Sequence, residues 1–362
     1  MTTQKGSSQP AESDPPPNTT RHRPTTMREV AEAAAVSVAT VSLVVNNKKD
    51  ARIGADTRKR VRDAIRVLGY RPNALAKNLV SGSSRFIGLV ADAIATTPFA
   101  GQIIRGAQDE AWKHGYVLLI ANTEGNEPAE KEAISMMLEH KVRGILYSTW
   151  YHRVAQVPAA LNETDFVLVN CFARDSDAWA VVPDEVQGGR AATEILIRHG
   201  HRRIAFLNTT TPSPARDGRL QGYREALESA GIPFDPNLVF DAYPDQEGGY
   251  AAVEGLVQCG VTAVFCHNDR VAMGVYDGLR QVGMSIPEDI AVVGFDNQEV
   301  IAAHLRPPLS TVALPHYRLG AAGVRLLLGL DEAPGNGVLR IVCPVVERDS
   351  VSTRQEKAPA NM

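Results

Sequence analysis

The stretch MREVAEAAAVSVATVSLVVNN, residues 27–47, has the pattern of two short helices joined by a tight turn. Thr26 followed by Glu29 forms a capping box that opens the first helix. Ser37 is an N-cap for the second helix. Such a pair predicts a helix-turn-helix, whose second helix enters the major groove of DNA. An ordinary helical hairpin at the edge of a larger domain has the same pattern, so this stretch alone leaves both interpretations open.

The residues that follow extend the helical region. Apolar residues at helical spacing predict a third helix over 55–68, ended by Gly69. Residues 26–80 carry 11 Lys or Arg against 5 Asp or Glu, whereas residues 81–362 carry 24 against 34. A basic module joined to an acidic body indicates that only the first part approaches a polyanion. A solvated charged helix explains the same excess, so charge does not by itself establish nucleic-acid binding.

Length and composition limit the class of protein. A chain of 362 residues with 44% hydrophobic residues is long enough for two or three globular domains. No apolar run is as long as a membrane span, so we expect no membrane partner. Residues 1–25 are rich in Pro, Ser and Thr and lack the apolar segment of a secretory signal, which predicts a disordered tail and a cytoplasmic location. The four scattered cysteines predict buried thiols.

From Arg85 onward, short apolar runs alternate with amphipathic helices. The strands are expected at Phe86–Ala91, Tyr116–Ala121, Gly144–Tyr147, Phe166–Asn170, Ala180–Val182, Arg203–Leu207, Ala263–Cys266 and Ile290–Gly294. The helices are expected near 100–114, 129–140, 186–199, 216–230, 247–259, 269–282 and 317–329. Such alternation predicts doubly wound parallel sheets of the α/β class. About 280 residues exceed one ordinary sheet, so we expect two similar subdomains with a cleft between them.

Several motifs in order resemble the lactose repressor/galactose repressor family. The stretch quoted above and DTRKRVRDAIRVLGYRPNALAKNL resemble the family's head. The likeness continues through QGGRAATEILIRHGHRRIAFL (187–207), RLQGYREAL (219–227), FCHNDRVAMG (265–274) and IPEDIAVVGFDN (286–297). It implies a three-helix headpiece followed by two subdomains like those of periplasmic binding proteins. It also implies a sequence-specific transcriptional regulator, a repressor in most of the family, that acts as a homodimer on a double-stranded DNA operator.

The resemblance divides the chain into a helix-turn-helix domain at 26–71, a hinge helix and linker at 72–84, an effector-binding and dimerisation domain at 85–350, and a tail at 351–362. It implies a small-molecule effector, a sugar or sugar derivative, and no cofactor. The residues expected to contact DNA are Thr26, Ser37, Val38, Ala39, Thr40, Ser42, Leu43, Asn46, Arg58, Tyr70, Asn73, Ala76, Lys77 and Leu79. Leu79 matches the family's apolar wedge, which kinks the duplex from the minor groove; packing on the third helix is the alternative.

The sequence departs from the family pattern in the turn and on the reading helix. Ala35 stands where the family usually has Gly, so the turn must tolerate a residue without glycine's conformational freedom. Leu43 stands where the family usually has Arg or another polar base reader, and Leu contacts only a thymine methyl or the backbone. Val38 and Ala39 are also small and apolar. We therefore expect operator choice to depend on Thr40, Ser42, Asn46 and DNA shape.

The ligands of open α/β sheets bind beyond the carboxyl ends of the strands, which gives one candidate effector site. The residues expected there are Phe99, Asn122, Trp150, Asn170, Arg216, Arg219, Asn268, Asp269 and Asp296. Of these, Arg219 and Asp296 match the family's effector-binding Arg and Asp most directly. Planar polar groups beside aromatic faces suit a sugar. Asp269 has an alternative role as the N-cap of the helix at 269–282, and Trp150 as a surface aromatic.

Other function classes fit the sequence less well. The chain contains no Walker A motif, no G-x-G-x-x-G after a strand, no H-E-x-x-H and no G-x-S-x-G, so we expect no enzyme. In HGHRR, residues 199–203, Gly200 is expected to end a helix, which explains the basic residues better than a metal site does. A transport-type sugar-binding protein needs a signal peptide and no helix-turn-helix. A sugar kinase needs a phosphate-cradling loop.

Overall fold

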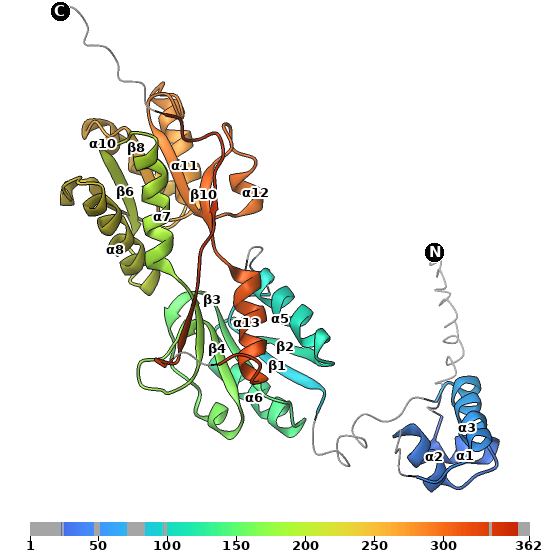
Figure 1. Cartoon of the computed structure of the whole chain (residues 1–362). Helices are drawn as coiled ribbons and strands as arrows, with labels where there is room; N and C mark the ends of the chain where they lie inside the picture. Colours follow the sequence, from blue (N-terminus) through green and yellow to red (C-terminus); the bar gives the residue numbers. More distant parts are fainter. Residues whose placement is uncertain are drawn as a thin grey trace, which may run out of the picture. The chain divides into compact units, whose positions relative to one another are not determined.

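The computed structural model describes residues 23, 25–46, 51–70, 84–95, 97, 100–332 and 335–353. It divides the chain into two units, Met1–Gly82 and Ser83–Met362 (Figure 1). The first unit is helical and the second contains the β-sheets, and each is described by itself. The predicted hinge residues Asn73, Ala76, Lys77 and Leu79 and the predicted effector residue Phe99 lie outside the described residues. So do nearly all of the two predicted tails.

The helical unit contains α1 (Met27–Ala33), α2 (Val38–Val45) and α3 (Ala55–Leu68). The capping box at the start of α1 is present, because the Thr26 N–H donates to Glu29 Oε2 at 2.6 Å and the Glu29 N–H donates to Thr26 Oγ1 at 3.3 Å. Ser37 Oγ accepts the Thr40 N–H at 3.1 Å at the start of α2. Gly69 ends α3 with a φ of 62°. The three predicted helices are confirmed.

Buried valines pack the three helices together. Val30, Val41 and Val61, one from each helix, are fully buried and form the centre of the headpiece core. The turn between α1 and α2 passes through Ala35, whose φ of 51° lies in the left-handed region. The turn therefore places a strained backbone angle on a residue with a Cβ, as the sequence predicted.

The α/β unit contains two six-stranded sheets. The first has the order β11-β5-β4-β3-β1-β2, and its strand pairs are parallel. Its strands are β1 (Phe86–Ala91), β2 (Val117–Asn122), β3 (Ile145–Val154), β4 (Phe166–Phe172), β5 (Ala180–Pro183) and β11 (Val338–Ile341). The helices packed on it are α5 (Gly101–Lys113), α6 (Glu127–Glu139), η1 (Ala159–Glu163) and α13 (His316–Leu327).

The second sheet has the order β12-β10-β9-β8-β6-β7 and is parallel except for β12, which pairs antiparallel with β10. Its strands are β6 (Ile204–Thr209), β7 (Val239–Ala242), β8 (Ala263–Cys266), β9 (Ala291–Asp296), β10 (Ser310–Ala313) and β12 (Val345–Val346). Its helices are α7 (Glu185–Arg198), α8 (Pro214–Ser229), η2 (Pro236–Leu238), α9 (Gln246–Ala251), α10 (Val253–Gln258), α11 (Asp269–Gln281) and α12 (Glu299–Ala302). The two sheets define the first and the second subdomain.

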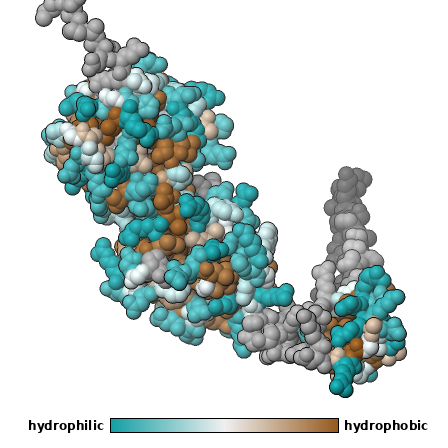
Figure 2. All heavy atoms as spheres, viewed as in Figure 1, coloured by the Kyte–Doolittle hydropathy of each residue, from teal (hydrophilic) through white to brown (hydrophobic). Residues whose placement is uncertain are grey.

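Helices bury both faces of each sheet, as the continuous apolar strands require. In β1, Ile87 and Leu89 point to the core under α5 and α13, whereas Val90 points to the core under α6. In the second subdomain, α7 and α8 cover one face and α9 to α12 cover the other. Hydrophilic residues form most of the face of the α/β unit drawn in Figure 2, which agrees with cores that lie between these layers.

The chain passes between the two subdomains three times, from β5 to α7, from β10 to α13 and from β11 to β12 (Figure 1). The strands predicted between 86 and 294 and the two-subdomain α/β class are confirmed. The sequence prediction missed β7, β10, β11 and β12 and expected one helix where α9 and α10 lie. Three of the missed strands, β7, β11 and β12, are edge strands of four residues or fewer, and β7 and β11 each contain a charged residue, so their apolar runs are too short to mark a strand.

The described part of the chain contains neither a membrane-spanning helix nor a metal-binding cluster. Among the helices that the structure describes, none combines the length and hydrophobicity that a bilayer crossing requires. The described residues contain no group of His, Cys, Asp and Glu side chains arranged to hold a metal ion. His199 closes α7 and Gly200 follows it with a φ of 84°, so HGHRR is a helix C-terminus as predicted.

Candidate functional site

The helical unit carries the first candidate site on α2. Val38, Ala39 and Leu43 are exposed, whereas Thr40, Ser42 and Asn46 are half-buried. The Asn46 Nδ2–H donates to Ser42 Oγ at 3.3 Å, and the hydroxyls of Ser37 and Thr40 lie 2.9 Å apart. The helix therefore presents its predicted reading residues at the surface, with the polar ones engaged in bonds to each other.

Two predicted DNA contacts have intramolecular roles in the structure. Arg58 donates from Nε to the Ile53 carbonyl at 3.3 Å and from Nη2 to the Ala51 carbonyl at 3.0 Å, so it fastens the loop before α3. Tyr70 is 8% exposed and belongs to the core of the headpiece. The structure therefore gives Tyr70 a packing role in the headpiece, and its contact with DNA stays a prediction.

The second candidate site is a cavity of about 260 Å³ between the two sheets of the α/β unit. Residues of both subdomains line it, mostly at the carboxyl ends of strands, as expected for an open α/β fold. They are Trp150, Tyr151, His152, Asn170, Glu185, Thr209, Thr211, Ser213, Ala215, Arg219, Tyr243, Pro244, His267, Asn268, Arg270, Asp296 and Leu314. Five of the predicted effector residues therefore come together: Trp150, Asn170, Arg219, Asn268 and Asp296.

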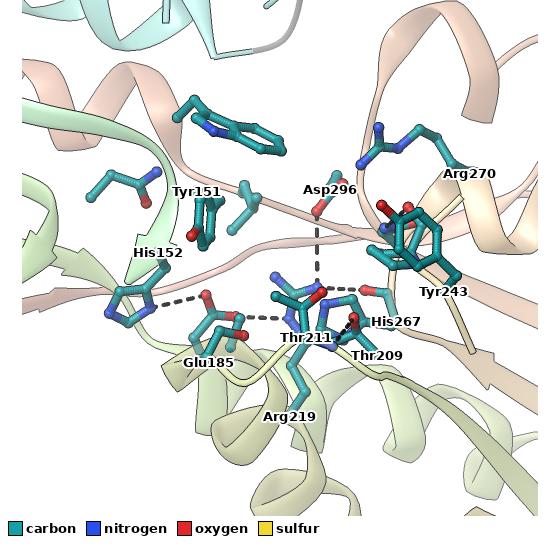
Figure 3. Close-up of a pocket in the computed structure, with 17 residues that line it drawn as sticks. Tyr151, His152, Glu185, Thr209, Thr211, Arg219, Tyr243, His267, Arg270 and Asp296 are labelled. Atoms are coloured by element: carbon teal, nitrogen blue, oxygen red, sulfur yellow. Dashed lines mark hydrogen bonds and ion pairs between the residues drawn. The ribbon is translucent and has the colours of Figure 1, made fainter. Parts of the chain in front are cut away.

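Arg219 lies at the centre of the charged network in Figure 3. Its Nε donates to Glu185 Oε2 at 2.8 Å, Nη1 donates to the His267 carbonyl, and Nη1 lies 4.0 Å from Asp296 Oδ1. The guanidinium also stacks over the Phe295 ring with 3.7 Å between the guanidinium carbon and the ring centroid. These contacts hold the guanidinium in place, and the side chain is buried.

Close packing of α7 on α8 brings Glu185 to Arg219. A Cβ on Gly189 would overlap the backbone of Arg219, so glycine is needed for the two helices to approach this closely. On its other side, Glu185 Oε1 lies 3.2 Å from His152 Nδ1 at the end of β3. Burial opposes ionisation of Glu185, but the positive charge of Arg219 and the bond to His152 outweigh it and lower the pKa to about 2.

Asp296 ends β9 with a φ of 104°, an angle unusual for a residue with a Cβ. Burial raises the pKa of this carboxyl to about 6, although the charge of Arg219 opposes the rise. Gln298 Nε2–H donates to Asp296 Oδ2 at 2.9 Å, and Asp269 Oδ2 accepts the Gln298 N–H at 2.6 Å. Asp269 therefore orients Gln298, which in turn fixes the carboxyl of Asp296.

Four residues that line this cavity each have a buried polar atom without a hydrogen-bond partner among the described residues. The atoms are His152 Nε2, Asn170 Oδ1, His267 Nδ1 and Arg270 Nε. Burial, reinforced by the charge of Arg219, holds the pKa of His267 well below its usual range, so its ring is neutral. A buried polar atom without a partner costs free energy, so a polar neighbour that reaches these side chains is favoured.

Three predicted effector residues lie elsewhere. Arg216 is absent from the lining, because its Nε donates to the Thr209 carbonyl at 2.8 Å and its Nη2 to Asp241 at 3.2 Å. Asn122 donates to Glu124 Oε1 at 2.6 Å on the rim of the first sheet. Asp269 is fully buried beneath the cavity, and its alternative as an N-cap is also wrong, because Asn268 caps α11.

Comparisons with known proteins agree with both sites. Residues 26–73 match the family model described as bacterial regulatory proteins, lacI family, and residues 193–351 match a periplasmic binding protein-like domain. The ribose operon repressor of Haemophilus influenzae is 31% identical over 320 residues, covering 88% of this chain and 95% of the relative. This chain belongs to the lacI family of bacterial regulatory proteins.

Solved structures extend the likeness to nearly the whole chain. The lac repressor dimer bound to operator and the anti-inducer ONPF has a TM-score of 0.74 at 25% identity, covering 91% of this chain and 100% of that one. A complex of the transcriptional regulator CelR with cellobiose has a TM-score of 0.62 at 30% identity, covering 90% and 100%. The lacI-family protein is thus a DNA-binding transcriptional regulator with a small-molecule site between its subdomains.

Sequence reasoning missed several residues of the lacI-family protein's cavity. His152 was missed because the predicted third strand ended at Tyr147, whereas β3 continues to Val154. His267 directly follows β8, so the rule that ligands bind beyond strand ends also points to it. Glu185 begins α7 rather than following a strand's last residue, and only its pairing with Arg219 reveals it.

Proposed function

We propose that this lacI-family protein is a homodimeric repressor whose affinity for its operator is set by a sugar or sugar derivative bound in the cavity between the subdomains. The observation that carries the proposal is the set of four unpartnered polar atoms, two on the first subdomain and two on the second. A polyhydroxylated ligand both donates and accepts hydrogen bonds, so it satisfies such a mixed set. Trp150 and Tyr243 supply apolar ring faces for the sugar ring.

Control of DNA binding follows from ligand contacts on both subdomains. In this proposal the sugar forms hydrogen bonds to both subdomains, with Asn170 and His152 on the first and Asp296 and His267 on the second. It therefore stabilises one separation of the two sheets over another. The effector shifts the equilibrium only by its difference in affinity for the two arrangements. In this proposal residues 72–84 form the hinge that passes the difference to the headpiece at 26–71, with Leu79 wedged into the minor groove of a pseudo-palindromic operator.

Two of the similar proteins support a sugar as the effector. One is named for the ribose operon and another was solved with cellobiose. The proposal includes no catalytic step and places the regulator in the cytoplasm, where bacterial DNA lies. Residues 85–350 carry both the effector site and the dimer contact.

The test is a thermal-shift screen of the purified full-length protein against a panel of neutral pentoses, hexoses and disaccharides. A sugar that binds the native state raises its melting temperature by mass action. We expect at least one sugar to do so and to change operator affinity in fluorescence anisotropy. Asp296→Asn should reduce the shift, whereas Asp241→Asn, which removes a charge outside the cavity, should preserve it. No shift with any sugar, or equal shifts in both variants, contradicts the proposal.

A further inference from the structure

The reading helix α2 presents an apolar face that the headpiece core does not use. Val41 and Val44 are buried, yet Val38 is 45% exposed and Leu43 is 38% exposed. With 100° per residue, positions 38, 39, 42 and 43 share one side of the helix. Hydrophobic residues also reach the surface of the helical unit in Figure 2. On a helix that enters the major groove, side chains on this side are placed to meet the base edges.

The polar groups of α2 bond within the helical unit. The hydroxyls of Ser37 and Thr40 pair at 2.9 Å, and Asn46 donates to Ser42 Oγ at 3.3 Å. The helix itself, VATVSLVV, contains no acidic or basic residue. What this face offers a partner is therefore methyl groups, with few unengaged donors or acceptors.

The partner of this face is DNA, because residues 26–73 match the regulatory-protein family and carry the basic part of the chain. The major groove has one apolar group that varies with sequence, the 5-methyl of thymine. Guanine, cytosine and adenine edges instead offer polar atoms that Val and Leu do not satisfy. A Leu or Val placed against a polar base edge desolvates it without a hydrogen bond, which disfavours those bases.

We propose that Val38 and Leu43 recognise thymine 5-methyl groups, so that the operator half-site carries thymine at the positions these two side chains face. Recognition at these positions depends on the methyl rather than on base hydrogen bonds. Cytosine methylated at carbon 5 carries the same group in the same groove and is a partial substitute there. The inference rests on the DNA-binding function and is independent of which effector fills the cavity.

The experiment selects operators with the full-length protein from a library of random duplexes, and then replaces each selected thymine by deoxyuridine. This change removes only the methyl and leaves base pairing intact. Burial of one methyl corresponds to about a fourfold change in affinity. We expect about a fourfold loss for one half-site, and about 15-fold for both, at the positions facing Val38 and Leu43. Deoxyuridine at other positions should change affinity less than twofold.

Protein variants assign each methyl to its side chain. Leu43→Ala should bind two operators with equal affinity when they differ only by thymine or deoxyuridine at the position that faces residue 43. Val38→Ala should do the same for the position that faces residue 38. Leu43→Arg should shift the selected base at its position to guanine, because Arg donates to O6 and N7 of guanine. Val67→Ala is the matched control: Val67 is 80% exposed on α3, and its variant should keep the full deoxyuridine profile.

Three results overturn the proposal. One is a selected operator without thymine enrichment, and another is a loss below twofold for deoxyuridine at every position. A third is an unchanged deoxyuridine profile in both Leu43→Ala and Val38→Ala, with circular dichroism showing folded protein. Each of these results leaves specific DNA binding intact and so separates the failure of methyl recognition from failure of the regulator function. Failure to select any duplex contradicts both.

Discussion

Glu185 is the residue on which both halves of the α/β unit meet. It is 4% exposed, with His152 of the first subdomain at 3.2 Å from Oε1 and Arg219 of the second at 2.8 Å from Oε2. A buried ion pair costs much to desolvate, and loss of one partner leaves the other charge uncompensated. The buried carboxylate of Glu185 lies beside the ligand cavity. There its fixed charge orients His152 and Arg219, which line the cavity.

Glu185→Gln is expected to destabilise the α/β unit by about 3 kcal/mol at pH 7, because the carboxyl has a pKa of about 2 against an ordinary 4.5. A lowered folded-state pKa contributes stability that is complete above pH 4.5 and is lost as pH falls toward 2. The difference between wild type and variant should therefore shrink by about 1 kcal/mol between pH 7 and pH 3.5. Urea unfolding at the two pH values measures it.

The control for this prediction is Glu194→Gln on the same helix. Glu194 pairs with Arg190 at 2.7 Å, but both side chains are more than 40% exposed. Water screens such a pair, so its removal should cost under about 1 kcal/mol. An equal loss in both variants, or a pH-independent loss in Glu185→Gln, contradicts the argument from burial.

Asp296 makes ligand affinity depend on pH near neutrality. Burial raises its pKa to about 6, so the carboxylate is mostly ionised at pH 7.5 and mostly protonated at pH 5. If sugar hydroxyls donate to the ionised form, affinity should fall by up to about tenfold between pH 7.5 and pH 5. Isothermal titration calorimetry with a sugar from the screen measures the change.

The matched variant Asp296→Asn keeps the shape of the side chain and removes the titrating group. Its affinity should be lower than that of wild type at pH 7.5 and nearly flat across the range. A wild-type affinity that does not vary with pH, or a variant that varies as strongly as wild type, is incompatible with a hydroxyl bonded to ionised Asp296.

At the scale of elements, the turn between α1 and α2 stores strain that the sequence does not relieve. Ala35 has a φ of 51°, and this conformation costs a residue with a Cβ about 1–2 kcal/mol. Ala35→Gly removes that cost but loses about 0.5–1 kcal/mol through unfolded-chain entropy. The headpiece should gain about 0.5–1 kcal/mol, as measured by hydrogen exchange of the Val41 and Val61 amides.

Ala34→Gly is the control for the turn. Ala34 has a φ of −86° and is 2% exposed, so a glycine there loses a buried methyl and gains no relief of strain. That variant should lose about 1 kcal/mol or more. Stabilisation by both glycines, or by neither, contradicts the assignment of strain to Ala35 alone.

Elements also show why part of the fold was predictable. Strands β1, β4, β6, β8 and β9 lie inside their sheets and are buried on both faces, so continuous apolar runs reveal them. Edge strand β11 has only one buried residue of four, and β12 has two residues and none buried. Buried β10 reads STVA, in which polar residues hide the strand. Local composition does not record these pairings, because they form between residues far apart in sequence.

The contrast between local sequence and distant contacts also explains which site residues were predictable. Asn170 and Asp296 lie near or at the carboxyl ends of buried strands and Asn268 follows one, so strand ends alone indicate them. Arg216 lies only three residues before Arg219 in sequence, but α8 turns its guanidinium toward the Thr209 carbonyl and away from the cavity. The direction of a side chain on a helix depends on the neighbours it meets, and those neighbours come from other segments.

At the scale of the whole molecule, the link from His152 to Glu185 joins subdomains that the effector must move together. His152 lies at the end of β3, is 8% exposed and contacts Phe172 edge-on with 5.9 Å between ring centroids. The bond from Arg219 to Glu185 uses Oε2, whereas His152 lies at Oε1, so we expect it to persist when the imidazole is removed. Removal of the imidazole therefore loosens the connection between the subdomains while the charge centre of the second subdomain stays intact.

The measured quantity is the ratio of the operator affinities with and without effector. In His152→Leu this ratio should lie about fivefold closer to one than in wild type. The reason is that the arrangement favoured by the effector then has one buried hydrogen bond fewer. Fluorescence anisotropy on the selected operator, at saturating sugar and without it, measures the ratio. His199→Leu is the control, since His199 bonds within its own helix at 2.9 Å from the Ile195 carbonyl. If the ratio stays at the wild-type value while sugar affinity alone falls, His152 binds the ligand but does not couple the subdomains.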